Sequence, residues 1–527
     1  MNALEKNHKT LQLLIKGLSN EEISSVKKYL NCFDDVFGNT ITKTANLFDL
    51  LISEENYSLE EIIKEIYPYS PNVEAFDKLS KRLMEKIHEC LLLDINIDRK
   101  DAYPDYVKAI INVRKKIMQS EILLGRGLTN DIDSLYDKII LKAQKFELYS
   151  ELVEVLYLKQ HYVGIRNGKD EYNKISDAIQ LAEKCRNGVY RACSLYYDQL
   201  ITSDFSASNQ SDIEQLQESI NDLKNLYSQT KSATIGYYYF LMEFELLKSK
   251  GQYMEAKAAC LNLVDLIQDN PAIYQKRRLG SAFVRLSTNE LYTYDFKDSA
   301  LHARIAQDYF NKNTINYGIA KETEFYSHFY QGDLEKAHSL INALLKDTGS
   351  DSEFLFSKRS FLAANVSFLM KDKKSTNQFL MDTKEINKDK EGWNIGIRIL
   401  SIISQIEAGV NDPAEAQVES MRKHIERTMK QKEVRGRDII ILRILNELVN
   451  QSFDFKAVWK SRKHLFDQLA SQEANHKWQI KGHELIVFHE WFKAKVNNTE
   501  YSAKIQDPAK VVAAVEKSID LSKAVNH

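Results

Sequence analysis

Glycine and proline are scarce in this chain. It contains 18 Gly and 6 Pro among 527 residues, whereas the two together make up about 12% of an average protein. Because these residues punctuate strands and tight turns, their scarcity disfavours a turn-rich β fold and predicts long helices with short connections. The length exceeds a typical domain of about 150 residues, but a repeat array can absorb it as one structural unit.

Long apolar runs and a net charge are also missing. No apolar run approaches the roughly 18 residues of a membrane span. Glu5, Lys6 and Lys9 interrupt the apolar positions at the N-terminus, so we expect no secretion signal. The formal charge of −2 provides no general attraction to phosphate backbones or anionic membranes. We therefore expect a cytoplasmic protein without a membrane span, whose partner is a protein or peptide rather than nucleic acid.

The cysteines follow no metal-binding or redox pattern. They are odd in number and widely spaced, and no two form a C-x-x-C pair. Their positions are Cys32, Cys90, Cys185, Cys193 and Cys260. This pattern predicts buried thiols in a reducing compartment.

Signatures of catalysis are likewise missing. No G-x-S-x-G elbow or comparable motif marks a serine or cysteine as a nucleophile. The G-R-G at residues 125–127 lacks the Lys-Ser/Thr of a phosphate-binding loop. The 74 acidic residues are balanced by 72 Lys and Arg, so neighbouring carboxylates are expected on solvated helix surfaces. We predict that the protein is not an enzyme and that it holds no cofactor.

The strongest metal candidate is the run from His483 to Glu490, H-E-L-I-V-F-H-E. If the run is helical, six residues turn through about 600°, and His483 and His489 point about 120° apart. The i, i+4 histidines of zinc proteases have a different spacing. With Trp478 and Trp491 close in sequence, the alternative is that both histidines edge a packed aromatic face. We therefore predict no metal site.

Helix-start signals mark the first hundred residues as a separate unit. At Ser19 (S-N-E-E) and Ser58 (S-L-E-E) a hydroxyl can accept from first-turn amides, while Glu22 or Glu61 reaches back. The buried stripe expected on the next long helix is Phe76, Leu79, Leu83 and Ile87. These signals predict an N-terminal helical domain at residues 1–100.

Internal repeats decide the architecture of the remainder. The clearest copies are Gly251–Ala256, G-Q-Y-M-E-A, and Gly332–Ala337, G-D-L-E-K-A. In each copy a Gly can end one helix in the left-handed conformation, and a small Ala lets two helices cross closely. Weaker copies begin at Asp295 and Lys371, and the spacing runs from 37 to 44 residues. Equivalent apolar positions around the two clear copies are Phe244, Cys260, Leu263, Phe325, Ile341 and Leu344.

These corners resemble those of tetratricopeptide (TPR) repeat proteins, whose helical hairpins repeat every ~34 residues and stack into a superhelix. That family usually has a small residue where Phe244 and Phe325 stand, and only Pro271 approximates its Pro after the second helix. The longer period indicates TPR-like hairpins of irregular length. In the N-terminal half, the runs LLIKGLSNEEISSVKKYL, EILLGRGL and KIILKAQKFELYSELVEV resemble uncharacterised helical-repeat proteins of Bacteroidota. This second resemblance implies a bacterial setting and no activity.

Together these features predict an all-α fold. We expect an α-solenoid of TPR-like antiparallel helical hairpins at residues 105–500, after the small N-terminal domain and the polar joint Asp98–Pro104. A C-terminal helical tail is predicted at residues 501–527. The expected function is a cytoplasmic protein–protein interaction scaffold or regulatory adaptor that uses the concave face of the solenoid.

The resemblance to TPR proteins implies which residues form that face, because the first helix of each hairpin lines it. The residues off the buried stripe of three such helices are Tyr238, Leu241, Glu245, Glu322, Tyr326, Phe329, Lys358, Phe361, Asn365 and Phe368. Aromatic anchors with few charges are typical of an interface core, so we predict a partner helix or extended segment held by apolar contact. The alternative is that these residues pack against adjacent hairpins.

One segment carries a local charge excess. Between Glu419 and Arg443, eight Lys or Arg accompany four acidic residues, an excess of +4. With the W-K-S-R-K run at residues 459–463, it could meet an acidic partner or a nucleic-acid strand. It could equally be a solvated helix surface. A nucleic-acid-binding helical-repeat regulator is therefore the alternative function.

Overall fold

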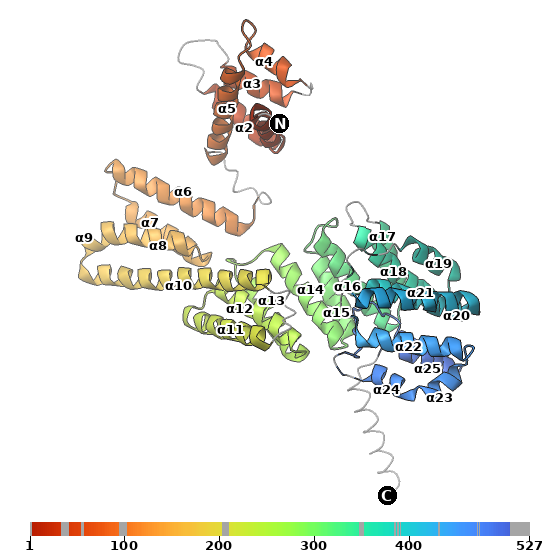
Figure 1. Ribbon diagram of the computed structural model, residues 1–527. Helices are drawn as coiled ribbons and strands as arrows, with labels where there is room; N and C mark the ends of the chain where they lie inside the picture. Colours follow the sequence, from red (N-terminus) through yellow and green to blue (C-terminus); the bar gives the residue numbers. More distant parts are fainter. Residues whose placement is uncertain are drawn as a thin grey trace. The chain divides into compact units, whose positions relative to one another are not determined.

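The computed structural model forms two compact units, residues 1–108 and 109–527 (Figure 1). It describes residues 3–32, 42–53, 57–93, 103–202, 210–346, 353–383, 386, 389, 392–430, 433–471, 473 and 475–505. The helices of the first unit are α1 (Ala3–Lys16), α2 (Asn20–Asn31), α3 (Lys43–Ile52), α4 (Leu59–Ile66) and α5 (Val73–Leu93).

The helix starts of the first unit follow the two signals in its sequence. Ser19 caps α2 and Ser58 caps α4, and in both cases the hydroxyl accepts from the third helical amide while the glutamate there returns a bond to the cap amide. The long helix α5 contacts α1, α2 and α3. Its stripe Phe76, Leu79, Leu83 and Ile87 is buried as expected. The expected joint falls largely on residues 98–102, outside the described residues.

The second unit is a succession of helices, most of which pack on their neighbours in the chain. Its helices are α6 (Asp105–Gly125), which begins at the end of the first unit, α7 (Ile132–Lys145), α8 (Tyr149–Lys159), the π-helix η1 (Gln160–Gly164), α9 (Ile165–Asn167), α10 (Lys169–Thr202), α11 (Gln210–Thr230), α12 (Ala233–Ser249), α13 (Tyr253–Asp269), α14 (Lys276–Tyr292), α15 (Phe296–Gln307), α16 (Ile315–Gln331), α17 (Leu334–Lys346), α18 (Glu353–Leu369), α19 (Lys373–Asp382), α20 (Trp393–Glu407), α21 (Asn411–Met429), α22 (Gly436–Asn450), α23 (Phe455–Ser461), α24 (Lys463–Ala470) and α25 (Phe488–Val496). We call α12, α14, α16, α18, α20 and α22 the first helices of the hairpins.

A left-handed residue reverses the chain at each of these hairpin corners. Gly251, Gly332 and Gly409 have φ of 73°, 82° and 75°. Tyr294 and Lys371 adopt φ of 60° and 61° although they carry side chains. In every case the next amide donates to the carbonyl five residues earlier, as the amide of residue 333 does to His328. This bond pattern satisfies the last carbonyls of the first helix and starts the second helix antiparallel to it.

The predicted corner positions are confirmed. Ala256 and Ala337 have no exposed surface, and Ala300 and Thr376 at the weaker copies expose 7% and 1%. The apolar positions expected around the two clear corners are also buried, namely Phe244, Cys260, Leu263, Phe325, Ile341 and Leu344. Small residues at these points let the second helix lie close to the first.

The all-α prediction is confirmed for the described residues, among which no strand occurs. None of the described helices is long and apolar enough to cross a bilayer. Of the predicted C-terminal helical tail, residues 501–505 are not helical, and residues 506–527 lie outside the described part of the chain.

A charge at a corner alanine should disrupt the hairpin. We expect Ala256→Asp or Ala337→Asp to lower the free energy of unfolding by about 3 kcal/mol or more, because each places an unpaired carboxylate where two helices touch. Chemical denaturation monitored by circular dichroism measures this loss. Ala258→Asp is the matched control, since Ala258 lies on the same helix α13 and is exposed. An equal loss at positions 256 and 258 would contradict the assignment of the corner.

Candidate functional site

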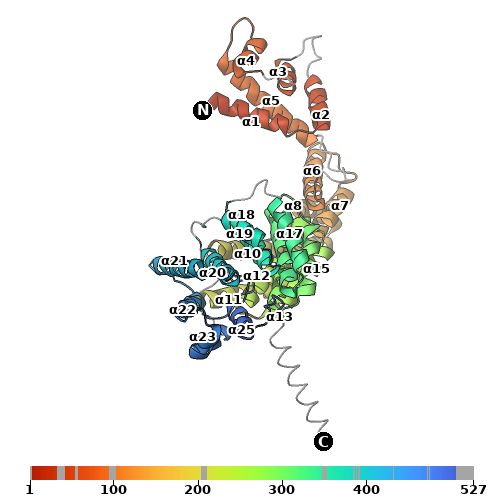
Figure 2. The same cartoon turned by 90° about the vertical axis from the view of Figure 1, so that its right-hand side faces the viewer.

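The last part of the described chain no longer alternates regularly between first and second helices of hairpins. Helices α22 to α25 form the final helical group, and α22, α23 and α25 lie beside one another in both views (Figures 1 and 2). Between α24 and α25 the chain is irregular, and it is irregular again after α25. We call residues 475–505 the returning segment, because they contact hairpins that precede them by more than 100 residues.

The returning segment lies on α16, the first helix of an early hairpin. The Trp478 ring meets Tyr330 edge to face at 5.5 Å, and the Lys481 ammonium lies 5.6 Å from the centre of the Tyr326 ring. The Ile505 amide donates to the carbonyl of Tyr330 at 3.0 Å. Both ends of the segment therefore rest on the C-terminal half of α16.

Two glycines make room for the segment on α20. A Cβ on Gly396 would lie 2.2 Å from the carbonyl oxygen of His483, and one on Gly392 would lie 2.9 Å from the His483 ring. No real Cβ tolerates such a separation from a backbone atom, so only glycine at position 396 allows the segment to pass. This is a close backbone approach of the kind that glycine permits.

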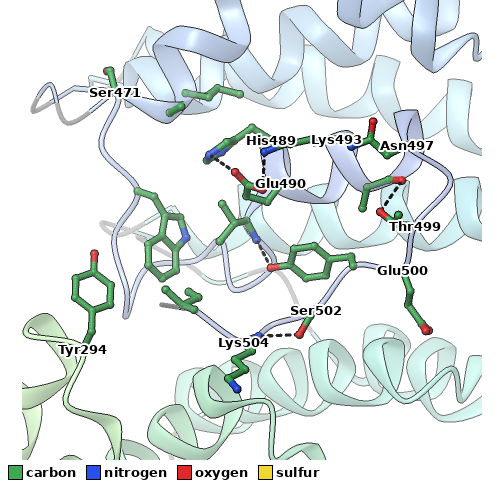
Figure 3. A pocket seen from close by; sticks show the side chains of 17 residues that line it. Tyr294, Ser471, His489, Glu490, Lys493, Asn497, Thr499, Glu500, Ser502 and Lys504 are labelled. Carbon is green, nitrogen blue, oxygen red and sulfur yellow. Dashed lines mark hydrogen bonds and ion pairs between the residues drawn. The ribbon is translucent and has the colours of Figure 1, made fainter. Parts of the chain in front are cut away.

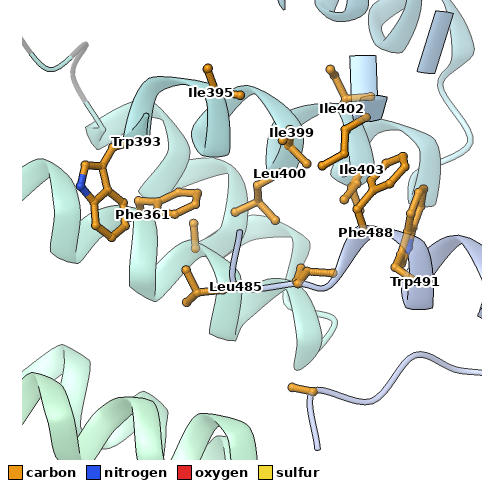
Figure 4. Close-up of a cluster of buried hydrophobic side chains, with 14 of the residues drawn as sticks. Phe361, Trp393, Ile395, Ile399, Leu400, Ile402, Ile403, Leu485, Phe488 and Trp491 are labelled. Carbon is orange, nitrogen blue, oxygen red and sulfur yellow. The ribbon is translucent and has the colours of Figure 1, made fainter. Parts of the chain in front are cut away.

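Apolar side chains of the segment complete the core of this region. Leu485, Phe488 and Trp491 belong to the same buried cluster as Phe361 of α18 and Leu400 of α20. Figure 4 shows Leu485 close to Phe361 and Leu400, with Phe488 and Trp491 farther along α20. The Trp491 indole also donates to Glu407 at the end of α20 at 2.9 Å. The segment thus fills space between first helices that the hairpins alone leave open.

A buried ion pair and a buried hydrogen bond fix the segment to the first turn of α22. Arg437 donates to both carboxylate oxygens of Glu484 at 2.5 and 2.8 Å, and Asp438 lies 3.0 Å from the Nε2 atom of His483. All four side chains are 98% or more buried. A buried charge is tolerated when it is paired and hydrogen-bonded, and neighbouring residues of α22 pair here with neighbouring residues of the segment.

Arg437 is saturated with acceptors. A guanidinium has five N–H donors. Besides the two oxygens of Glu484, it faces the carbonyl oxygens of Leu469 and His476 at 2.6 and 2.9 Å and the Nδ1 atom of His489 at 3.2 Å. One side chain thereby joins α22, the end of α24 and the returning segment, including its helix α25.

The contact with Arg437 decides the protonation of His489. Since a guanidinium cannot accept a hydrogen bond, Nδ1 of His489 must be the acceptor and Nε2 carries the proton. Burial, together with the Arg437 charge, lowers the pKa of His489 below its usual value. His489 is therefore neutral at pH 7.

The expected helix through His483 and His489 is wrong at its first half. Residues 483–487 are irregular, and α25 begins only at Phe488. Every residue from 483 to 488 is buried, and such an apolar run is also typical of a buried helix. The run is buried here because the chain passes between α20 and α22. The two histidines have different partners, and among the described residues no group of three His, Cys, Asp or Glu could hold a metal ion.

A cavity of about 680 Å³ lies beside this network. In Figure 3, His489, Glu490 and Lys493 lie on α25, and Glu500, Ser502 and Lys504 lie on the chain that follows it. The carboxylates of this cavity are already paired, Glu490 with Lys493 at 3.8 Å and Glu500 with Lys371. Within the described residues no hydroxyl hydrogen-bonds to His489, so no serine–histidine pair is formed here.

Most of the ten predicted partner-binding residues do not lie on an open surface. Seven are buried, exposing 7% or less: Tyr238, Leu241, Glu322, Tyr326, Phe329, Phe361 and Asn365. Glu245, Lys358 and Phe368 are partly exposed. Tyr238 packs with residues of α10 and α11, and Leu241 packs with residues of α13 and α14. The returning segment contacts Tyr326 and belongs to one buried cluster with Phe361. A stretch of polypeptide does lie against α16 and α18, but it belongs to the same chain. Partner binding by these residues stays a prediction.

Two of the predicted residues bind each other. Lys358 on α18 donates to Glu322 on α16 at 2.7 Å, and its ammonium lies 5.3 Å from the centre of the Trp393 ring. Burial alone would favour the neutral acid, but the Lys358 charge beside it lowers the pKa of Glu322 below its usual range. The pair joins successive first helices.

The first-helix face remains open farther toward the N-terminus. A hollow of about 390 Å³ lies between α12, α14 and α16. We call it the first-helix hollow; its lining is Phe244, Glu245, Lys248, Arg277, Ser281, Val284, Arg285, Thr288, Phe310, Asn316 and Ile319. The residues from α14 recur at the three- and four-residue spacing of a single helix face, so the hollow is formed by corresponding faces of consecutive first helices.

Of the predicted residues only Glu245 lies in this hollow. Sequence reasoning missed Arg277, Ser281 and Arg285 because it did not treat α14 as the first helix of a hairpin. The signal was present: the weaker corner copy at Asp295 follows α14 directly.

The described part of the segment with the +4 excess is not one continuous cationic surface. Arg437, one of its eight cations, has no exposed surface. Arg422 pairs with Glu419 at 2.7 Å and also with Glu426, and Lys423 pairs with Glu419 at 3.4 Å. Farther along, Arg462 pairs with Glu447 at 2.7 Å. These contacts reduce the positive charge available to a nucleic-acid strand.

No family model matches the chain, and no curated protein matches it. The resemblances to TPR proteins and to Bacteroidota helical-repeat proteins stay predictions.

A methyl group at position 396 should expel the returning segment. We expect Gly396→Ala to increase hydrogen exchange of the amides in residues 475–488 severalfold, because the new Cβ collides with the His483 carbonyl. Mass spectrometry of peptic fragments measures this. Gly125→Ala is the control, since a Cβ there meets nothing within 4 Å. Unchanged exchange in the Gly396 variant would show that the segment does not pass so close to α20.

Breaking the buried ion pair should cost more than removing both partners. Arg437→Met leaves Glu484 buried without its partner, for which we expect a loss of about 3–5 kcal/mol in unfolding free energy. The double variant Arg437→Met with Glu484→Leu should lose less. Arg422→Met, at an exposed pair, should lose about 1 kcal/mol or less. Equal losses in the Arg437 and Arg422 variants, by urea denaturation, would contradict the central role of Arg437.

Proposed function

We propose that this chain is a cytoplasmic protein-interaction scaffold or regulatory adaptor that binds an extended segment of a partner protein in the first-helix hollow. In this proposal the hairpins of the second unit form a TPR-like α-solenoid, and the first helices provide its binding face. The proposal concerns residues 244–319, which include the lining of the first-helix hollow.

The observation that carries the proposal is the returning segment itself. It is a largely irregular stretch with one short helix, α25, and it is held on α16, α18, α20 and α22 by ring contacts, backbone hydrogen bonds and a buried ion pair. The first-helix hollow lies on the same series of helices and includes Ile319, one turn before Glu322 on α16. A face that binds one stretch of polypeptide over part of its length has suitable chemistry to bind another over the rest. The volume of the first-helix hollow lies within the range of ordinary ligand sites, about 300–1,000 Å³.

Site-specific photo-crosslinking tests this location. With a photoreactive amino acid at Ser281, inside the hollow, we expect irradiation of the native cell to attach a discrete partner protein, because its bound segment passes within reach. The same amino acid at Lys297, exposed on the second helix α15, is the control. Mass spectrometry of the adducts identifies the partner. Identical adducts at both positions, or adducts at position 297 alone, would rule out the hollow as the binding site.

A further inference from the structure

Positively charged side chains outnumber negatively charged ones in the lining of the first-helix hollow. Lys248, Arg277 and Arg285 line it, and Glu245 is the single acidic residue among its lining residues. Glu245 already forms ion pairs with two of these cations. The Nε atom of Arg285 lies 3.1 Å from the Oε1 atom of Glu245, and the Nζ atom of Lys248 lies 3.6 Å from its Oε2 atom. One carboxylate thus balances one of three positive charges.

Of the three cations in the hollow, Arg277 is the one that no carboxylate neutralises among the described residues. It is exposed, and none of the hydrogen bonds or ion pairs among the described residues involves it. The nearest acidic residue along the α16 face, Glu322, is held by Lys358 at 2.7 Å and is 95% buried. The hollow therefore retains positive charge that the protein does not neutralise.

The start of α14 adds to this positive potential. Its first three residues are Lys276, Arg277 and Arg278, and its first turn contains no acidic residue. The N-terminal end of a helix carries a partial positive charge and favours anions, so three cations there oppose the usual preference. Arg278 is turned aside, with its guanidinium 4.7 Å from the centre of the Tyr237 ring. A bound carboxylate would relieve the repulsion that remains at Arg277.

The lining between these cations is apolar. Phe244, Val284, Phe310 and Ile319 belong to it. Phe244 is almost fully buried, whereas Ile319 exposes 40% of its surface. Such a surface accepts an apolar side chain, and the cations at Lys248 and Arg277 would face groups on either side of it.

We infer that the segment bound in the first-helix hollow is an acidic peptide with an apolar anchor, its carboxylates pairing with Lys248 and Arg277. This inference rests on the proposed function and adds the chemistry of the partner. Opposite charges across an interface raise the association rate and select the partner. A nucleic-acid strand would also seek positive charge, but it offers no aliphatic anchor for Ile319 and Val284.

Selection from a random peptide library tests the inference with the full chain. We expect peptides recovered on the wild-type protein to be acidic and to contain a large apolar residue. For the best of them, the dissociation constant should rise at least tenfold in Lys248→Glu with Arg277→Glu, and it should also rise steeply with salt. The matched control is Lys224→Glu with Lys297→Glu, which changes the net charge equally at exposed residues outside the hollow; its affinity should stay within twofold of the wild type.

The neutral variant Lys248→Gln with Arg277→Gln separates charge from misfolding, and its affinity should fall between those of the wild type and the reversal variant. Recovered peptides without acidic bias, or equal loss in the reversal and control variants, would overturn the inference and leave the proposed function standing. Tighter binding of a single-stranded oligonucleotide, lost in the reversal variant, would also overturn it. Failure to recover any peptide would overturn the proposed function as well.

Discussion

The left-handed corner residue is the constraint on which the second unit depends. Each corner must let one helix end and the next begin antiparallel within two or three residues. A residue with positive φ achieves this while its neighbour's amide satisfies the carbonyl five residues earlier. Glycine adopts this conformation freely, but Tyr294 and Lys371 bear a cost of about 1 kcal/mol or more. The contacts of the hairpin offset that cost, since Phe296 and Thr376 just beyond these corners are buried.

Once the corners have set the hairpins, charged pairs fix how successive hairpins lie. Arg285 on α14 binds Glu245 on α12, and Lys358 on α18 binds Glu322 on α16. These pairs connect one first helix to the next, beside apolar clusters that run both within and between hairpins. Partly buried pairs between defined atoms restrict register more than apolar contacts do, because they are lost when the helices slide. The orientation of the first helices is therefore well defined along the hollow.

One part of the first-helix face is covered and another part is open. From the C-terminal half of α16 onward it is covered by the returning segment, which Arg437 and Asp438 anchor through Glu484 and His483. From α12 to the start of α16 it is open and positively charged. The covered part contains the aromatic residues that sequence analysis assigned to a partner. A polypeptide does lie on them, but it is supplied by the chain itself, and the binding proposal moves to the open part.

The sequence by itself determined the helices, the corners and the absence of strands among the described residues. Capping residues at Ser19 and Ser58, small residues such as Ala256, and helix-spaced apolar stripes are local signals, and each acts within a few residues of the structure it specifies. Tertiary structure alone decided which side of a first helix is open. Tyr326 and Phe361 have the composition of an interface core, yet their burial depends on residues more than 100 positions later. The path of His483 between α20 and α22 likewise depends on Gly396, because a buried irregular segment and a buried helix share the same apolar composition.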